Sequence, residues 1–551
     1  MRARHAVAAA ATVILGLTGC NANPTAPAEP SGFAKGGTLR ILSSSTEFSL
    51  DPAKSQSLAI TSSGLVLRRL TTWDISPGKP PAVVPDLATD TGRTTDGGKT
   101  WTFTLKDGLT FPDGSPITTR DIKYGVERSF APELGGGLGY HKTLLDGGEA
   151  YKGPYTGASL ASIVTPDDKT ITFTLKTAYG DWPWIVSMPA FSPVPKASDD
   201  PANYGKNPVP SGPYRITSYT AGAEAVLERN PAWKQETDQV RTAGPDKIIF
   251  QLGQDTTVAA QRLVADSGDD KGAFGANFVP PAQLAQAQSN PSVKDRIVTS
   301  SPGALAYLVI NTRRVTDVRV RQALAYASDK RAYLVASGGE LGGSPASTLI
   351  TPGIPGRVAY DLYPTTDPAG DVAKAKELLT AAGQTAPKLT LLTRSDGQWS
   401  SQAQALQQGF ARAGITVEIR TEEYESWFEH VTSGERDDYD LTLTSWQPDF
   451  PSANGNIAPL FASTEIGGGG FNLSRYSAPE VDQLIAAATA EVDPARSGAL
   501  WAQADKRILQ DVPVVPLIYT RNSFLRGSSV ENFYIGEYPT YPNYLKASLK
   551  Q

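Results

Sequence analysis

The chain contains one cysteine, Cys20, which lies three residues after the end of an apolar run near the N-terminus. Arg2, Arg4 and His5 precede this run, which extends from Ala6 to Leu17. A run of about a dozen residues is shorter than the ~20 that span a bilayer as a helix, and a basic flank before it is typical of an export signal. Because a single thiol cannot form an intrachain disulfide, we expect an exported fold held together by hydrophobic cores alone.

The segment Leu17-Thr18-Gly19-Cys20 resembles a bacterial lipobox. The resemblance implies that residues 1–19 are a signal peptide and that Cys20 becomes the first mature residue, with a diacylglycerol on its thiol. A free thiol beside an ordinary cleavage site is the alternative. Residues 20–35 are rich in Pro and Ala, a composition that cannot form a core, so we predict a flexible tether.

The length and charge of the mature part limit the classes of protein to which the chain can belong. About 530 residues correspond to three or four domain-sized units, and a mean hydropathy of −0.26 fits a soluble globular body. Without Arg2 and Arg4 the chain has 49 basic and 56 acidic residues, a net charge of −7. Phosphate binding requires clustered positive charge, so we expect no nucleic-acid partner.

Two segments of the first half nearly repeat one another. Residues 99–106 read KTWTFTLK and residues 169–176 read KTITFTLK. Thr on one face and apolar residues on the other is the pattern of half-buried neighbours in an antiparallel sheet. Residues 38–42 predict a further strand, and Thr118 with Asp121 predicts a capping box before a helix over 121–130.

The second half has more predicted helices, which alternate with strands. Helices are predicted at 318–327, 372–382, 401–413 and, after a Ser477/Glu480 capping box, 481–490. Strands are predicted at 389–392, 415–419 and 514–519. The sequence therefore predicts a mixed α+β first part and an α/β second part with a βαβ unit.

Motifs for catalysis are missing from the sequence. Only His141 and His430 follow the signal segment, and neither belongs to a recognisable catalytic pattern. No nucleophile elbow and no zinc-ligand spacing occurs. Residues 92–100 resemble a phosphate loop but precede a strand, so we predict a turn. We expect no enzymatic activity, no cofactor and no metal site.

Several blocks spread over the mature chain resemble, in order, the family 5 extracellular solute-binding proteins, the receptors of oligopeptide, dipeptide and nickel importers. The most specific block is 96–118, DGGKTWTFTLKDGLTFPDGSPIT. The other blocks are residues 36–41, 50–52, 85–88, 210–214, 311–312, 317–327, 472–476 and 479–484. The sequence departs from the family at 267–272, where SGDDKG replaces a Gly-Glu-Ile-Asp-like segment.

The resemblance implies a periplasmic-binding-protein-like fold of two lobes with an extra subdomain in the first lobe. We expect the first lobe to comprise residues 36–72, 208–303 and 512–551, with 73–207 inserted as the subdomain. Residues 304–511 would form the second lobe. Two chain crossings, at 301–303 and 511–513, would then form a hinge that closes on the ligand.

The same resemblance assigns a ligand site in the second lobe. Residues 439–450 read YDLTLTSWQPDF, a strand followed by a loop, and Asp449 is similar to the family's acidic residue that pairs with the α-amino group of a peptide. Trp446 and Phe450 are candidates for walls of the cleft. Trp399 and Asn472 are further candidates. A surface turn capped by Asp449, with the aromatic residues in a core, is the alternative interpretation.

We therefore expect a monomeric substrate-binding lipoprotein, held on the outer face of the cytoplasmic membrane through Cys20, that delivers a peptide to the permease of an ABC importer. A metal chelate, an oligosaccharide or an opine is an alternative ligand. A secreted hydrolase and a signalling receptor for a peptide pheromone are alternatives from other classes. Since mature His and Met are scarce, direct ligation of a soft metal is not expected.

Overall fold

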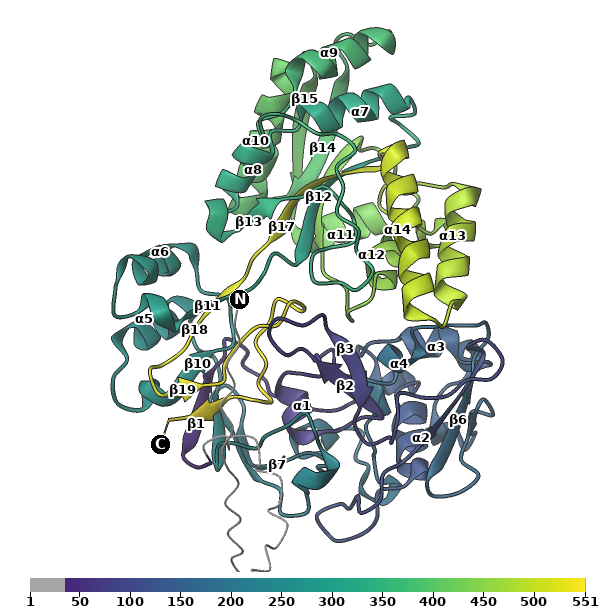
Figure 1. Ribbon diagram of the computed structural model, residues 1–551, viewed down its shortest axis with the longest axis vertical. Coiled ribbons are helices and arrows are strands. Elements are labelled where there is room, and N and C mark those ends of the chain that lie inside the picture. Colours follow the sequence, from purple (N-terminus) through teal and green to yellow (C-terminus); the bar gives the residue numbers. More distant parts are fainter. Residues whose placement is uncertain (1–34, 551) are drawn as a thin grey trace, which may run out of the picture. The chain divides into compact units, whose positions relative to one another are not determined.

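The computed structural model describes residues 35–550, which belong to one compact body comprising residues 34–551. The predicted signal peptide, Cys20 and nearly all of the predicted tether lie outside the described residues. The body contains two main sheets, one formed mostly by the first half of the chain and one by the second half (Figure 1). Among the described residues, no helix has the length and apolar character needed to cross a membrane.

The first sheet is mixed and has five strands, in the order β10-β1-β9-β8-β7. Strand β1 pairs in parallel with both β9 and β10. The strands are β1 Thr38–Leu42, β7 Tyr214–Thr220, β8 Glu224–Arg229, β9 Lys247–Gln251 and β10 Ala273–Gly275. The helices around it are α1 Ser62–Val66, α5 Thr256–Ala265 and α6 Pro281–Ser289.

The segment between β1 and β7 forms smaller sheets of its own. The two near-repeats are β4 (Thr100–Thr104) and β6 (Thr170–Thr174), which pair antiparallel with each other, so this prediction is confirmed. Their apolar side chains are buried, and the Oγ1 atoms of Thr102 and Thr172 lie 3.0 Å apart on the other face. The remaining elements are β2 Thr71–Asp74, β3 Ala82–Pro85, α2 Thr119–Arg128, α3 Tyr140–Leu144, β5 Ile163–Val164 and α4 Trp182–Ile185.

The second sheet has six strands, in the order β13-β17-β12-β16-β14-β15. They are β12 Ala304–Ile310, β13 Gly343–Pro345, β14 Lys388–Arg394, β15 Thr416–Glu422, β16 Leu441–Trp446 and β17 Val514–Thr520. Strand β12 is buried on both faces, since alternate residues enter different hydrophobic cores. The predicted βαβ unit is confirmed, because β14 and β15 are parallel and α10 (Gly397–Arg412) connects them.

Helices cover both faces of the second sheet (Figure 1). They are α7 Val318–Ala327, α8 Lys330–Ala336, α9 Val372–Ala381, α11 Tyr424–Thr432, α12 Asn454–Phe461, α13 Pro479–Ala490 and α14 Pro494–Asp511. The predicted first residues of two helices are wrong. Helix α10 begins four residues before Ser401, because the side chain of Asp396 accepts a hydrogen bond from the amide of Trp399 and caps the helix there. Helix α13 has Ala478 as its N-cap without a side-chain bond, and Pro479 sets its first turn.

The C-terminal segment is divided between the sheets. Strand β17 pairs with β12 and β13, so its residues belong to the second sheet, although we expected residues 512–551 to join the first lobe. The following strand β18 (Ser523–Leu525) pairs with β11 (Ile297–Thr299). The two chain crossings run side by side, since the Ser300 amide donates to the Asn522 carbonyl at 2.9 Å. The short strands β19 (Val530–Glu531) and β20 (Ser548–Leu549) end the fold.

A cluster of ion pairs is buried beside the first sheet. Asp86 accepts hydrogen bonds from Arg68 at 2.7 Å and from Arg241 at 3.0 Å, and Arg241 also donates to Asp238 at 3.1 Å. All four residues are at most 2% exposed. Burial alone would raise the pKa of Asp238, but the charges of Arg241 and Arg68 outweigh it and hold the pKa well below its usual range.

Candidate ligand-binding site

The loop after β16, residues 447–453, carries the candidate acidic residue. Strand β16 pairs with β14 at its amino end and with β12 along its whole length, so β12 holds its carboxyl end in place. The loop is fastened further by the hydroxyl of Tyr538, which donates to the carbonyl of Pro448. Asp449 is therefore presented by a fixed backbone.

The Asp449 carboxylate lies against a residue from the first half of the chain. The hydroxyl of Tyr140, at the start of α3, donates to Oδ2 of Asp449 at 2.7 Å. Asp449 forms no ion pair with any described residue. Burial raises the pKa of Asp449, and the hydrogen bond from Tyr140 opposes this shift only in part.

A cavity of about 490 Å³ opens beside Asp449. Its lining comes from residues between 43 and 62, from residues 447–449, and from Phe250, Leu252, Ala276, Tyr541 and Tyr544. Glu47 and Asp449 are the charged side chains among its lining residues, and both are acidic. A positively charged group of a ligand would therefore be the complement of this cavity.

Aromatic side chains continue from Trp446 along the second half of the chain. The ring of Trp446 lies 4.9 Å from Phe471, which lies 6.0 Å from Phe428, and this ring stacks on Tyr424 at 6.0 Å. All four side chains retain some exposure, and Tyr424 is 50% exposed. We name these four residues the aromatic wall. They come from the end of β16, the loop before α13, and α11.

Arg394 joins the aromatic wall to Trp399. Its guanidinium lies 3.6 Å from the ring centre of Trp399, 4.9 Å from that of Trp427 and 5.6 Å from that of Tyr424. Nε of Arg394 is buried and donates to no partner among the described residues. Sequence reasoning missed this residue. The sequence could have indicated it, because Arg394 is a cation at the carboxyl end of β14, and β14 is the parallel neighbour of the strand that carries the candidate site.

The structure thus places Asp449, Trp446 and Trp399 at the same edge of the second sheet. Phe450 is different, because it is 1% exposed and packs edge-to-face on Tyr140 at 5.7 Å. Phe450 therefore packs against Tyr140 within the core and does not form a wall of the cavity. Asn472 is fully buried, and its amide donates to the carbonyls of Ala462 and Tyr476. We remove Asn472 from the candidate site, because its side chain stabilises the local backbone.

Neither histidine is among the residues that line the cavity. His141 is buried and bonds to Ser129 at 2.6 Å, and burial lowers its pKa to about 3. His430 is buried between Glu422 and Asp438. Among the described residues, no group of three or more His, Cys, Asp or Glu side chains is arranged to hold a metal.

The two sheets and the helices that cover them define a class of binding protein with two lobes. The family model "Bacterial extracellular solute-binding proteins, family 5 Middle" matches residues 82–468, and the chain belongs to this family. It is a transport binding protein and not an enzyme.

Known relatives cover most of the chain. The dipeptide-binding protein DppE of Bacillus subtilis is 23% identical over 79% of this chain and 78% of its own. The glutathione-binding protein GsiB of Salmonella paratyphi A is 26% identical over 80% and 81%. The solved structure of the clavulanic acid biosynthesis oligopeptide binding protein 2 is similar with a TM-score of 0.87 and 32% identity, over 94% of this chain and 96% of that one.

Proposed function

We propose that this protein captures peptides between its two lobes through their α-amino group and delivers them to the permease of an ABC importer. Asp449 carries the proposal. It is a partly buried carboxylate at a cavity whose charged lining is entirely acidic, and no described residue forms an ion pair with it. An ammonium group would supply the missing charge through a charge-assisted hydrogen bond. Relatives named for binding dipeptides, glutathione and oligopeptides support a peptide as the ligand.

The aromatic wall and Arg394 would hold the rest of the peptide. Arg394 lies beyond the wall from Asp449 and forms no ion pair with any described residue, so a carboxylate of the ligand is its natural complement. Aromatic faces accept many side chains without specific hydrogen bonds. This arrangement favours recognition of the peptide ends over recognition of a particular sequence.

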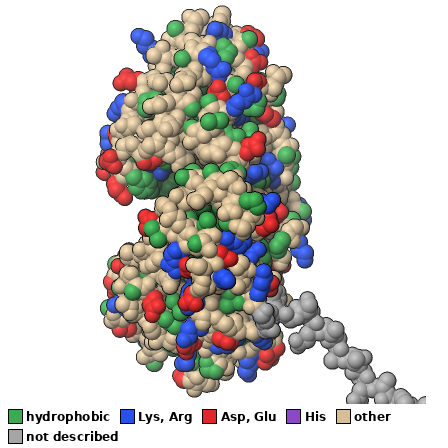
Figure 2. Space-filling view, turned by 90° about the vertical axis from the view of Figure 1, so that its left-hand side faces the viewer, with side chains coloured by type: hydrophobic (Ala, Val, Ile, Leu, Met, Phe, Trp, Pro, Cys, Tyr) green, Lys and Arg blue, Asp and Glu red, His purple; other side chains and the backbone are tan. Residues whose placement is uncertain are grey.

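Closure would occur about the two chain crossings. We propose a first lobe of residues 36–72, 208–303 and 521–551, a subdomain of 73–207 and a second lobe of 304–520. This moves the second crossing from 511–513 to 521–522, because β17 belongs to the second sheet. Figure 2 views the body from the side, with the second sheet in the upper part and an indentation below it. Ligand would drive closure only by binding the closed state more tightly.

Calorimetry with short peptides tests the proposal. We expect an affinity of about 1 μM, or roughly −8 kcal/mol, for peptides with a free N-terminus. Asp449→Asn should weaken binding by about 2–5 kcal/mol, because it removes one partner of a buried charged pair. Glu418→Gln, which removes an exposed carboxylate from β15, is the matched control and should bind as the parent does. Equal binding of N-acetylated peptides would refute the role of Asp449.

We further propose that Cys20 carries the lipid that holds the protein on the outer face of the cytoplasmic membrane, with residues 20–35 as the tether, and that the protein is a monomer. Cys20→Ala should move the protein from the membrane fraction to the soluble fraction. Unchanged membrane retention would contradict the anchor. Light scattering of the purified Cys20→Ala protein measures its mass and tests the monomer.

A further inference from the structure

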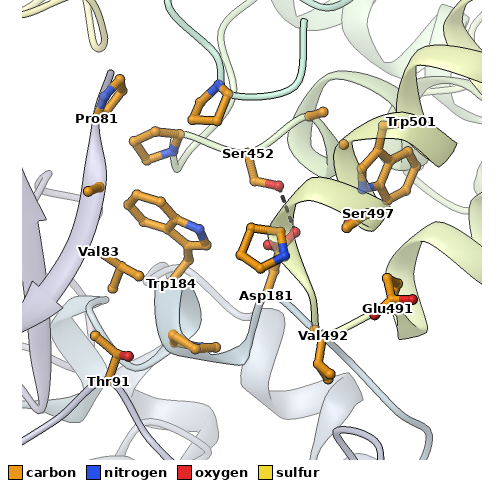
Figure 3. Close-up of a pocket in the computed structure, with 18 of the residues that line it drawn as sticks. Pro81, Val83, Thr91, Asp181, Trp184, Ser452, Glu491, Val492, Ser497 and Trp501 are labelled. Atoms are coloured by element: carbon orange, nitrogen blue, oxygen red, sulfur yellow. Dashed lines mark hydrogen bonds between the residues drawn. The ribbon is translucent and has the colours of Figure 1, made fainter. Parts of the chain in front are cut away.

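A second cavity lies on the other side of the loop that carries Asp449. Residues 447–449 line the first cavity, whereas residues 451–453 line this one, which has a volume of about 480 Å³. Its remaining walls come mainly from β3, from Trp101 of β4, from the start of α4 and from the start of α14 (Figure 3). The same loop therefore separates two cavities.

Asp181 is the polar centre of this second cavity. The hydroxyl of Ser452 donates to Oδ2 of Asp181 at 2.6 Å, which joins residues 271 positions apart in the chain (Figure 3). The side chain is enclosed closely enough that burial raises the pKa of Asp181, against the hydrogen bonds of Ser452 and Asn454. Asp181 is partly exposed, and it lines the cavity.

No cation compensates Asp181 within the described part of the chain. No Lys, Arg or His is among the lining residues of the cavity. The second lining carboxylate, Glu491, is already paired, because Arg496 donates to both of its oxygens at 2.9 Å. Asp181 is therefore the acidic group whose charge is available to a ligand.

The walls around Asp181 are apolar and aromatic. Three indole side chains, Trp101, Trp184 and Trp501, line the cavity together with five prolines. Trp184 and Trp501 lie on opposite sides of Asp181 in Figure 3. Indole faces attract cations, and the rigid rings of Trp and Pro lose little entropy when a ligand binds.

We propose that this cavity is a second ligand site, separate from the peptide site, for a small organic cation with a primary ammonium group on an apolar body. The ammonium pairs with Asp181 and Ser452, and the body lies against the indoles and prolines. A neutral molecule of the same shape leaves the Asp181 carboxylate buried without a counter-charge, so it binds more weakly.

Phenethylammonium and its neutral counterpart 2-phenylethanol test this proposal by calorimetry on the purified full chain. Phenethylammonium is expected to bind at least tenfold more tightly than the alcohol. Asp181→Asn should weaken its binding at least tenfold, whereas Asp449→Asn should change it less than twofold. Equal binding of the two probes, no detectable binding of phenethylammonium, or loss on Asp449→Asn would overturn the second site.

A second pair of variants guards against a folding defect of Asp181→Asn. Val83 lines the cavity from β3, and its neighbour Val84 does not. Val83→Phe fills the cavity and should weaken phenethylammonium binding at least tenfold, while Val84→Phe should leave it within twofold. Equal effects of the two changes would contradict the site. Since peptide binding is measured separately through Asp449, failure of one site is distinguishable from failure of the other.

Discussion

Asp86 and Asp238 lie among arginines beside the first sheet, whereas Asp449 and Asp181 lie at cavities on the two sides of one loop. The first pair has its counter-charges built in, and Arg241 contacts both members. The second pair accepts side-chain hydrogen bonds from neutral groups: the hydroxyl of Tyr140 at Asp449, and the hydroxyl of Ser452 and the amide of Asn454 at Asp181. The pKa of Asp238 is correspondingly lowered, and those of Asp449 and Asp181 are raised.

The comparison teaches that burial of a carboxylate can serve either the fold or a ligand, depending on where the positive charge comes from. A buried charge is costly unless it is paired. In the first cluster the chain supplies the pair, so we expect the acids to stabilise the folded state. At the loop the pair is missing, and a ligand can supply it.

The largest expected effect comes from removing the built-in cation. Arg241→Met should lower the free energy of unfolding by about 3–5 kcal/mol, because Asp86 and Asp238 then share fewer counter-charges in a buried site. Urea denaturation measures this change. Arg215→Met, at an exposed position on β7, is the control and should stay within about 0.5 kcal/mol of the parent. A loss below 1 kcal/mol for Arg241→Met would contradict the assigned role of the cluster.

Peptide affinity should depend on pH through Asp449. Its pKa is raised above the ordinary 3.8, and the ammonium ligand requires the ionised carboxylate. Affinity should therefore fall as the pH drops through this raised pKa, by about tenfold per pH unit below it. Calorimetry across the acidic range measures the profile. The remaining weak binding of Asp449→Asn should lack this dependence, and an unchanged profile in that variant would assign the titration to another group.

Tyr140→Phe should shift the same profile to higher pH. The hydroxyl of Tyr140 stabilises the ionised form of Asp449, so its removal raises the pKa of the carboxylate further. A shift of about 1 pH unit corresponds to a hydrogen bond of about 1.4 kcal/mol. Tyr151→Phe, which changes a tyrosine that bonds to Ala158, is the control. A shift to lower pH would contradict the geometry.

The smallest effect concerns stability without ligand. Because the folded-state pKa of Asp449 is raised, its ionised form costs stability above that pKa, and the cost disappears as the pH falls through it. Asp449→Asn at neutral pH should therefore leave stability unchanged or raise it by up to about 1 kcal/mol. For Asp238 the sign is opposite, because its lowered pKa contributes stability that is lost only as the pH falls through it. A clear destabilisation by Asp449→Asn would remove the contrast between the two groups.

Local patterns predicted much of the fold. The capping box of Thr118 and Asp121 is present at α2, and the turn at 92–100 is confirmed because Asp96 accepts from the amides of Lys99 and Thr100. Period-two alternation identified β4 and β6 because each strand needs only its own residues to separate a buried face from an exposed one. Helix starts were less certain where several polar residues could cap, as at Asp396 and Ser401.

The sequence by itself determined the elements, the family resemblance and the acidic loop around Asp449, since these are written in neighbouring residues. Only the tertiary structure decided which distant groups meet there. Tyr140 reaches Asp449 across 309 positions, and Arg394 lies at the same sheet edge because β14 and β16 are parallel. The tertiary structure also decided that the amide of Asn472 donates to backbone carbonyls and that Asp181 lines a second cavity. Charge pairing and burial depend on all elements that pack around a side chain, so they cannot be predicted from neighbouring residues in the sequence.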